Sequence, residues 1–322
     1  QNAVLLARRK QPELNINQID YNDQKVLDYI GTGKTDGVFQ LESAGMKGFM
    51  KELKPHNLED VIAGISLYRP GPMDFIPQYI RGKNDSSSIT YDCPQLEPIL
   101  APTYGCIVYQ EQVMQIVRDL AGYSLGRSDL LRRAMSKKKA AVMEKERKIF
   151  IYGDEETGVP GCIKNGIDEQ TANKIYDEMI DFAKYAFNKS HAAAYAVVSY
   201  QTAWLKYYFP VEYMAALMTS VIDNPSKVSE YIYACRQMNI KILPPDINKG
   251  EANFSVDGGD IRYGLAAIKS IGRPVIKAIV EDREELGLFQ NLEDFITRLS
   301  AKNILNKRTI ENLTGRPCEI GR

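Results

Sequence analysis

Apolar side chains recur at helical spacing along most of the chain. Strict alternation of apolar and polar residues, which marks a half-buried strand, never continues long enough to predict a large sheet. The sequence therefore predicts a mainly α protein. Helices are expected, from amphipathic pattern or capping residues, near residues 22–31, 57–67, 108–121, 128–151, 167–187, 190–209, 211–222, 226–238 and 274–285.

The pattern changes after a turn rich in proline, Leu243-Pro244-Pro245-Asp246. Two short strand-like pieces follow it, Ala252–Val256 and Ile261–Tyr263. We therefore expect a helical domain over residues 1–240 and a small α+β segment over residues 241–313. The last residues, 314–322, do not fit the helix that they interrupt, and we interpret them as a tail of cloning origin. The chain starts at Gln1 without an initiator methionine, which favours a fragment.

Composition narrows the class of protein only a little. The 322 residues are 44% hydrophobic and 25% charged, with 41 basic and 41 acidic side chains, as in an ordinary folded domain. Five scattered cysteines without a CxxC pair argue against a disulfide framework and a zinc site, and they favour a cytoplasmic location. Two histidines are too few for a histidine-rich metal site. No apolar run reaches the roughly 18 residues of a membrane span.

One segment, residues 126–149, concentrates positive charge within a neutral chain. Helical spacing places Arg133 and Lys137 one turn apart on one face, with Arg132 and Lys139 close by, and Ser128 is a plausible N-cap. Such a face should attract phosphate, because arginine binds oxygens as a bidentate fork and lysine adds point charge. A solvated charged face is the alternative. Its nine basic residues outnumber three acidic ones: Arg127, Arg132, Arg133, Lys137, Lys138, Lys139, Lys145, Arg147 and Lys148 against Asp129, Glu144 and Glu146.

A second candidate site lies in residues 184–195. Asn188 and Ser190 can cap a helix that starts near Ser190, and its exposed amides and dipole favour an anion. Lys189 adds charge to this helix end. Three aromatic rings offer stacking surfaces for a base, although core packing is an equally ordinary use for them: Tyr185, Phe187 and Tyr195. In the separate turn Arg69-Pro70-Gly71-Pro72, the prolines hold the backbone extended and can aim Arg69.

A third candidate is the stretch from Tyr263 to Pro274 with the helix-like segment after it. A helix, a short glycine-containing hairpin and a second helix resemble the helix-hairpin-helix module, in which backbone amides hold a DNA phosphate. Lys269 and Arg273 are positioned to assist. Ser270 stands where a GxG hairpin has its first glycine, so an ordinary helical hairpin is the alternative.

Seven motifs, in order, closely resemble the fingers region of the bacterial replicative DNA polymerase III alpha subunits, the C-family polymerases. The resemblance covers about residues 22–313. It implies a template-directed nucleotidyltransferase that, as a whole enzyme, uses two Mg²⁺ ions on palm aspartates. The motifs are VFQLES (38–43), YRPGP (68–72), PTYG (102–105), VYQEQVM (108–114), LRRAM (131–135), FNKSH (187–191) and ILPPDIN (242–248).

The same resemblance implies what this chain lacks and what its residues do. In the family the palm aspartates precede the segment that matches 38–43, and the sliding-clamp motif and further nucleic-acid-binding domains follow; none of these is visible here. Arg132 and Arg133 would meet the incoming triphosphate, with Lys137 on the same face. Glu42 and Arg69 would face the active-site cleft. The remaining expected site residues are Lys189, Ser190 and His191 in the nucleotide pocket, and Lys269, Ser270, Ile271, Gly272 and Arg273 on duplex phosphate.

The expected function is therefore that of a polymerase fragment. We expect it to bind deoxynucleoside triphosphate and primer-template DNA, and to lack catalytic residues and metal ligands of its own, so that it is inactive alone. In the intact protein the partners would include the sliding clamp and other replisome subunits, and no membrane. Two alternatives stay open: a non-catalytic DNA-binding module that uses the helix-hairpin-helix element, and a standalone nucleotide-binding enzyme with unrecognised carboxylates.

Overall fold

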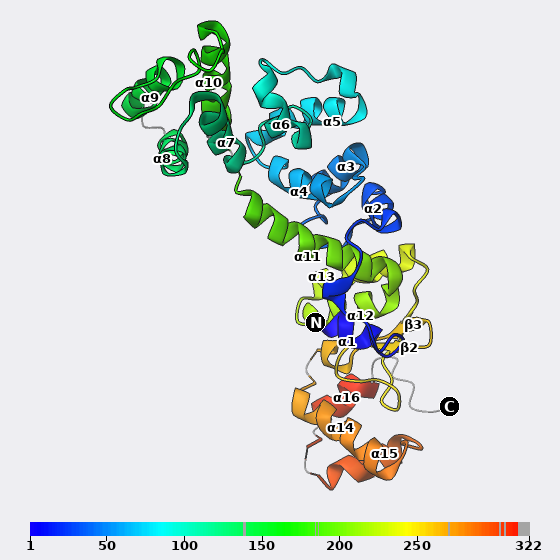
Figure 1. Ribbon diagram of the computed structural model, residues 1–322. Helices are drawn as coiled ribbons and strands as arrows, with labels where there is room; N and C mark the ends of the chain where they lie inside the picture. The colour runs from blue at the N-terminus through cyan, green and yellow to red at the C-terminus, as the bar shows by residue number, and fades with distance from the viewer. Residues whose placement is uncertain are drawn as a thin grey trace. The chain divides into compact units, whose positions relative to one another are not determined.

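The computed structural model describes residues 1–137, 140–183, 185, 187–269, 271–302, 304–305 and 307–314. The chain forms two compact units. Unit 1 contains residues 1–20, 35–39 and the chain from residue 201 onward; unit 2 contains residues 21–34 and 40–200. Figure 1 shows that helices dominate both units, which confirms the mainly α prediction.

Unit 2 is built from helices joined by turns and short 3-10 segments. Four of them, α7 to α10, pack around one apolar core whose central members include Ile116, Val117, Phe150 and Tyr176. Its α-helices are α2 (Gln24–Gly31), α3 (Ala44–Leu53), α4 (Leu58–Leu67), α5 (Ile76–Asn84), α6 (Glu97–Leu100), α7 (Gln110–Ala121), α8 (Leu125–Ser136), α9 (Ala140–Tyr152), α10 (Glu169–Ala183) and the first part of α11 (Lys189–Tyr208).

The basic segment forms two helices, α8 and α9, where the sequence predicted one helix over 128–151. The N-cap is Ser124, whose side chain accepts the amide hydrogen of Arg127, so the prediction of Ser128 as the cap was wrong. Ser128 lies inside α8, where its hydroxyl donates to the carbonyl of Ser124. Local composition favours helix throughout this stretch and therefore does not reveal where the helix begins or divides.

Several basic residues of this segment are held within unit 2 by acidic partners. Arg127 of α8 pairs with Glu146 of α9 at 3.0 Å, and Arg147 of α9 pairs with Asp177 of α10 at 2.5 Å. The Arg147 guanidinium also lies 4.8 Å from the centre of the Tyr176 ring. Part of the positive charge that the sequence concentrates here therefore serves helix packing rather than a ligand.

Unit 1 combines helices with a small sheet, as the sequence predicted for the region after residue 240. The strands β1 (Ile242–Leu243), β2 (Ser255–Asp257) and β3 (Asp260–Arg262) lie in the order β1-β3-β2, with β1 parallel and β2 antiparallel to β3. The helices are α1 (Asn2–Ala7), the end of α11, α12 (Pro210–Ser220), α13 (Pro225–Gln237), α14 (Arg273–Leu286), α15 (Leu292–Ser300) and α16 (Lys307–Thr314).

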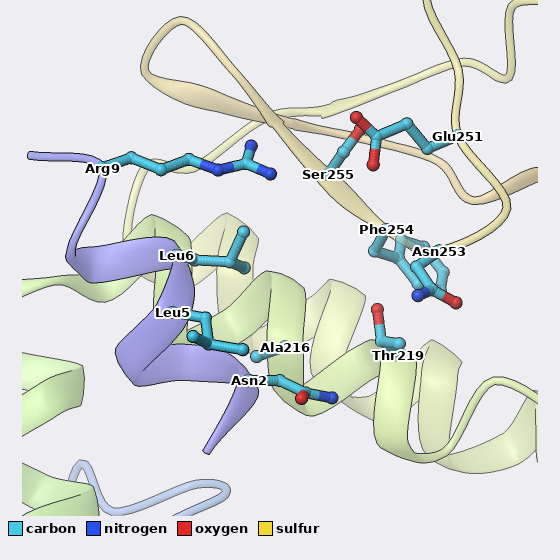
Figure 2. A pocket seen from close by; sticks show the side chains of 10 residues that line it. All are labelled: Asn2, Leu5, Leu6, Arg9, Ala216, Thr219, Glu251, Asn253, Phe254 and Ser255. Atoms are coloured by element: carbon cyan, nitrogen blue, oxygen red, sulfur yellow. The ribbon is translucent and has the colours of Figure 1, made fainter.

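An open pocket of about 330 Å³ lies between α1, α12 and the segment that leads into β2. Figure 2 shows Leu5 and Leu6 on the α1 side, Thr219 on α12, and Glu251 on the opposite segment. Its wall contains both polar and apolar side chains, and none of the residues named as candidate sites in the sequence lines it.

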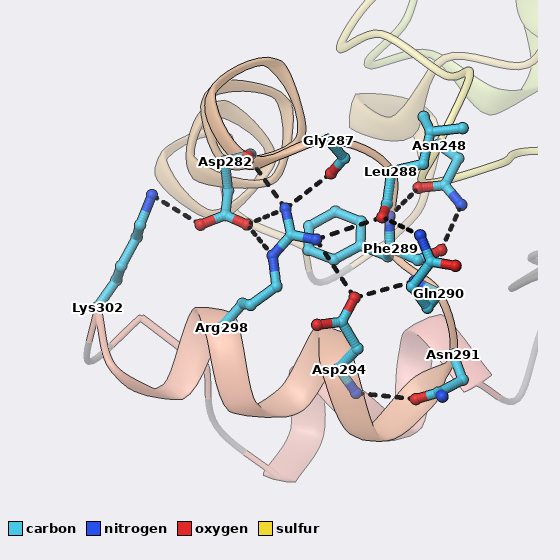
Figure 3. A network of polar contacts seen from close by, with 10 residues as sticks. All are labelled: Asn248, Asp282, Gly287, Leu288, Phe289, Gln290, Asn291, Asp294, Arg298 and Lys302. Atoms are coloured by element: carbon cyan, nitrogen blue, oxygen red, sulfur yellow. Dashed lines mark hydrogen bonds and ion pairs between the residues drawn. The ribbon is translucent and has the colours of Figure 1, made fainter.

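The C-terminal helices of unit 1 are joined by a polar network around Arg298 (Figure 3). Arg298 of α15 binds Asp282 of α14 at 2.7 Å and lies 4.2 Å from the centre of the Phe289 ring. Lys302 pairs with the same carboxylate at 2.9 Å. Burial disfavours the charged form of Asp282, but hydrogen bonds from Lys302 and Arg298 outweigh it and hold the pKa of Asp282 below its usual value. This network ties α14 to α15.

The two compact units do not divide at the boundary that the sequence indicated. Composition changes near residue 240, and β1 begins at Ile242, but the division between units falls after Tyr200, inside α11. The expected domain limits, residues 1–240 and 241–313, therefore remain a prediction that rests on the change of sequence pattern. Residues 315–322, most of the expected tail, lie outside the described residues. In the described part of the chain, no helix is both long enough and apolar enough to span a membrane.

Candidate nucleotide-binding site

A pocket of about 480 Å³ in unit 2 gathers residues from three of the motifs identified in the sequence. The segment before α3 contributes Glu42, the turn after α4 contributes Arg69, and the first turn of α11 contributes His191. The sequence assigned His191 to the nucleotide pocket and Glu42 and Arg69 to the active-site cleft; in the structure the three line one pocket. The full lining is Gln40, Glu42, Ser43, Met46, Ile65, Tyr68, Arg69, Phe187, His191 and Tyr195.

Arg69 is fixed on two sides. Its Nε donates to the carbonyl of Ser66 at 3.1 Å and its Nη2 donates to the carbonyl of Tyr185 at 2.8 Å. The guanidinium lies 4.1 Å from the centre of the Phe187 ring, a cation–π distance. Burial lowers the pKa of Arg69, but the side chain stays charged at neutral pH because arginine starts so high. A fixed positive charge therefore forms part of the pocket wall.

The turn that carries Arg69 depends on a glycine. Gly71 has a φ of 103°, which residues with a Cβ rarely adopt, and a Cβ there would lie 2.5 Å from the Tyr185 ring. The turn therefore packs directly against Tyr185. This close packing, together with the Arg69 hydrogen bond, links the end of α4 to the segment that leads into α11.

The aromatic side of the pocket follows one face of α11. The His191 ring lies 5.4 Å from the Phe187 ring and 4.5 Å from the Tyr195 ring, measured between centroids. His191 and Tyr195 stand four residues apart in α11 and share one helical face, whereas Phe187 precedes the helix and contacts His191 from there. His191 and Tyr195 are exposed, so their faces are accessible to a planar ligand such as a nucleobase.

The N-terminus of α11 differs from the prediction. The helix begins at Lys189, and two of its first amides are already occupied: the Glu111 carboxylate accepts the Lys189 N–H at 3.0 and 3.1 Å, and the Asn188 side chain accepts the His191 N–H at 2.9 Å. Ser190 lies in the first turn and is not the cap. Of the amides expected to favour an anion, that of Lys189 binds an internal carboxylate instead, and that of His191 is capped by Asn188, one of the two caps that the sequence predicted.

Lys189 also has an acidic partner. Its Nζ pairs with Glu59 at 3.0 Å and lies 5.3 Å from the centre of the Tyr109 ring. Glu59 itself is more than half exposed, so this ion pair is solvated and weak, and a phosphate can displace it at low cost.

The two neighbouring arginines of α8 occupy different environments. Arg132 is mostly buried; it binds Asp129 through Nε and Nη2 and donates from Nη1 to the Gln110 side chain at 3.1 Å. Arg133 is 62% exposed and binds Asp129 through Nε at 2.7 Å. Lys137 follows directly after α8 and is exposed. Lys138 and Lys139 lie outside the described residues.

The first turn of α7 connects α8 to the pocket. Gln110 accepts the hydrogen bond from Arg132, and its own N–H donates to the carbonyl of Phe187 at 3.0 Å. Phe187 lines the pocket, so Arg132 reaches the pocket wall through one intermediate residue. No described residue of α8 lines the pocket directly.

Sequence reasoning missed the acidic and amide partners: Asp129, Glu59, Gln110 and Glu111. Asp129 was detectable, since it stands three and four residues before the two arginines, the spacing of helical ion pairs. Glu111 was not, because 78 residues separate it from Lys189 and only the fold brings them together.

The candidate DNA-contacting hairpin lies in unit 1. Ile268 and Ile271 are buried and anchor it, whereas Lys269, Gly272 and Arg273 are exposed; Ser270 lies outside the described residues. No described side chain caps the N-terminus of α14, which starts after Gly272. In contrast to α11, this helix end therefore presents its first amides without an internal carboxylate.

The residues present do not fit the magnesium ions that the family resemblance implies. Among the described residues, no group of three or more histidine, cysteine, aspartate or glutamate side chains is arranged to hold a metal ion.

Comparison with known proteins identifies the class. A family model described as "Bacterial DNA polymerase III alpha subunit finger domain" matches residues 2–158, and a helix-hairpin-helix motif matches residues 239–316. These matches define a polymerase fingers region followed by a helix-hairpin-helix region.

Curated relatives extend the match to nearly the whole chain. The DNA polymerase III subunit alpha of Thermus aquaticus is 46% identical over 314 residues, covering 96% of this chain and 25% of that protein. The corresponding subunits of Escherichia coli K12 and Bacillus subtilis 168 are 47% and 43% identical, with 26% and 27% of their lengths covered. The chain belongs to the family of bacterial DNA polymerase III alpha subunits and spans about a quarter of the length of these relatives.

Proposed function

We propose that this chain is the part of a replicative DNA polymerase that binds the incoming deoxynucleoside triphosphate and contacts primer-template DNA. The observation that carries the proposal is the unit 2 pocket, in which Arg69, His191 and an aromatic wall meet. Rings that stack on a base beside fixed positive charge are the combination that a nucleotide needs.

The triphosphate would be bound through Arg69 in the pocket wall and through two basic residues outside the lining, Arg133 and Lys189. Arg133 offers an exposed guanidinium, and Lys189 is held only by a solvated partner. In phosphoryl transfer such groups stabilise charge that develops on the leaving pyrophosphate and position it. The nucleophile and metal chemistry belong, by family resemblance, to carboxylates outside this segment, so the fingers residues bind and orient.

DNA contact is proposed for the hairpin at the start of α14. Its uncapped helix N-terminus and exposed Lys269 and Arg273 suit a backbone phosphate, which is a sequence-independent contact.

The test uses a full-length alpha subunit that carries this segment, with Arg133→Ala and Arg133→Lys. Both variants should impair single-nucleotide incorporation, and Ala should lower kcat/KM by roughly tenfold to a hundredfold, equivalent to about 1.5–3 kcal/mol. Lysine keeps the charge but loses the fork, so a large Lys defect indicates bidentate contact. Arg118→Ala is the matched control, because Arg118 is also a half-exposed arginine whose Nε binds a neighbouring aspartate.

Two outcomes would count against the proposal. If DNA affinity collapses while nucleotide dependence stays normal, α8 follows the nucleic-acid backbone instead. If titration with a fluorescent nucleotide shows no binding with or without primed DNA, while the protein still binds duplex, the chain is a DNA-binding module and the pocket has a structural role.

A further inference from the structure

One carboxylate, that of Asp129, holds both neighbouring arginines of α8. Its Oδ1 accepts from Arg132 Nη2 at 2.6 Å and Nε at 3.1 Å, and its Oδ2 accepts from Arg133 Nε at 2.7 Å. The three residues stand at positions i, i+3 and i+4 and therefore share one helical face. Each oxygen thus serves a different guanidinium, and the group of three keeps a net charge of +1.

The two guanidinium groups are left in different states. All three nitrogens of Arg132 are engaged, two by Asp129 and one by Gln110, and its side chain is only 19% exposed. Arg133 is bound through Nε alone. Within the described part of the chain, its Nη1 and Nη2 make no hydrogen bond or ion pair. These two nitrogens form the edge that binds two oxygens of a phosphate in parallel.

We propose that Asp129 is a positioning residue for the triphosphate: it fixes Arg133 by Nε and leaves the Nη edge free to bind phosphate. Arg132 then acts as a brace between α8 and α7 rather than as a second phosphate ligand. This inference rests on the proposed function. It assigns phosphate binding to Arg133 and a structural contact to Arg132, whereas the sequence analysis expected both to bind the triphosphate.

The physical reason is preorganisation. A free arginine has many rotamers, and a phosphate that binds it must order the whole side chain. Asp129 orders that side chain beforehand. The added negative charge opposes an anion, but both of its oxygens already accept hydrogen bonds from guanidinium groups. Hydrogen bonding from Arg132 also holds the pKa of Asp129 below its usual value, against partial desolvation. Asp129 therefore stays ionised at neutral pH and keeps its contacts with both arginines.

The brace also reaches the pocket. Arg132 Nη1 contacts Gln110, whose N–H binds the carbonyl of Phe187 in the pocket wall. The Gln110 contact does not involve Asp129, so loss of Asp129 would release the orientation of Arg133 while Arg132 keeps its link from α8 to the pocket wall.

The experiment is a double-mutant cycle in a full-length alpha subunit that carries this segment, using Asp129→Ala, Arg133→Ala and the double variant. We measure KM and kcat for single-nucleotide incorporation, and the Kd for primer-template. Asp129→Ala should raise the nucleotide KM about threefold to tenfold with little change in DNA affinity. In the Arg133→Ala background the same change should have no further effect, because Asp129 acts through Arg133.

Two further variants guard against misfolding and general charge effects. Asp129→Asn keeps the shape and one acceptor oxygen, so a smaller rise in KM than for Ala is expected. Asp119→Ala on α7 removes an aspartate that likewise binds an arginine Nε, at 2.8 Å, and should leave KM unchanged within about twofold. A purely structural role for Asp129 would lower the amount of active enzyme, and hence kcat, without changing KM.

The outcomes separate this inference from the proposed function. If Arg133→Ala raises KM and Asp129→Ala does not, the positioning role is overturned and the nucleotide site stands. A lower KM in Asp129→Ala would show that the carboxylate competes with the triphosphate, and additive effects in the double variant would show that it acts independently of Arg133; either overturns the inference. An unchanged KM together with an unchanged kcat in Arg133→Ala overturns both, and an unchanged KM with a lowered kcat overturns this inference alone.

Discussion

Three cysteine thiols lie in the apolar interior, where charge is strongly disfavoured. Cys106, Cys162 and Cys235 are buried and not bonded to one another. Burial raises the pKa of each thiol from about 9 to about 12, although Lys206 opposes the shift at Cys235. These thiols are therefore structural groups, unreactive at neutral pH.

We expect the free energy of unfolding to fall as the pH rises above 9. Below pH 9 each thiol is protonated in both states, so it contributes no pH dependence; between pH 9 and 12 only the unfolded chain loses the proton. The fall should approach about 1.4 kcal/mol per pH unit for each thiol. Chemical denaturation at several pH values from 8.5 to 10.5 measures this free energy. It should fall less steeply with pH in Cys162→Ser than in the parent chain. Equal slopes would contradict a raised pKa at Cys162, and buried tyrosines affect both proteins alike.

Single residues also show where sequence reasoning stops. Arg69 and His191 were predicted from motif positions, and the fold brings them into one pocket; their roles stay a prediction. The Asn188 cap of α11 was predicted, but the carboxylate on the Lys189 amide was not foreseeable, since Glu111 approaches from another helix. A local pattern identifies side chains that are able to cap a helix, but a carboxylate brought by tertiary structure can take the same amides.

At the scale of elements, the contrast between two helix N-termini is informative. The first amide of α11 donates to the internal carboxylate of Glu111, whereas α14 begins after Gly272 without a capping side chain. The hairpin was predicted from its glycine and the helix after it, and the helix-hairpin-helix match supports it. The division of the basic segment into α8 and α9 was not predicted, because helix propensity is high on both sides of the break.

Gly272→Val tests whether the hairpin backbone approaches DNA. Gly272 has an ordinary φ of −72°, and a Cβ there would meet only Pro274 Cδ at 3.6 Å, so the variant should fold normally. If amides at this turn hold a phosphate, the larger side chain should weaken duplex binding about equally for all sequences and reduce its salt dependence.

Gly259→Val is the control for this experiment. Gly259 lies in the β2–β3 turn of the same unit, with no atom within 4 Å of its Cβ position. It should bind duplex like the parent chain. Unchanged affinity and salt slope in a folded Gly272→Val protein would make the hairpin a structural element only.

At the scale of the whole molecule, the mainly α character was predictable but the composition of the two units was not. Residues 35–39 join unit 1 although their sequence neighbours on both sides belong to unit 2. Lys206 donates to the carbonyl of Asp36 at 2.7 Å, and Tyr213 donates to that of Gly37 at 2.6 Å. Such long-range bonds to backbone groups leave no periodic trace in the sequence, whereas amphipathic helices do.

The last prediction concerns what the chain does alone. We expect the purified 322-residue chain not to extend a primer, because two-metal phosphoryl transfer needs carboxylates that hold Mg²⁺, and the family resemblance assigns them to a region outside this segment. Magnesium or manganese should not restore activity, since either ion requires the same kind of ligands. A full-length alpha subunit in the same assay provides the positive control.

The decisive result is extension that depends on this chain's own residues. Activity that co-purifies with the chain but persists in Arg133→Ala and Arg69→Ala would indicate a contaminating polymerase. Activity that those changes abolish would show a catalytic site within the segment, and the division between a fingers region that binds nucleotide and a separate region that performs the chemistry would then be wrong.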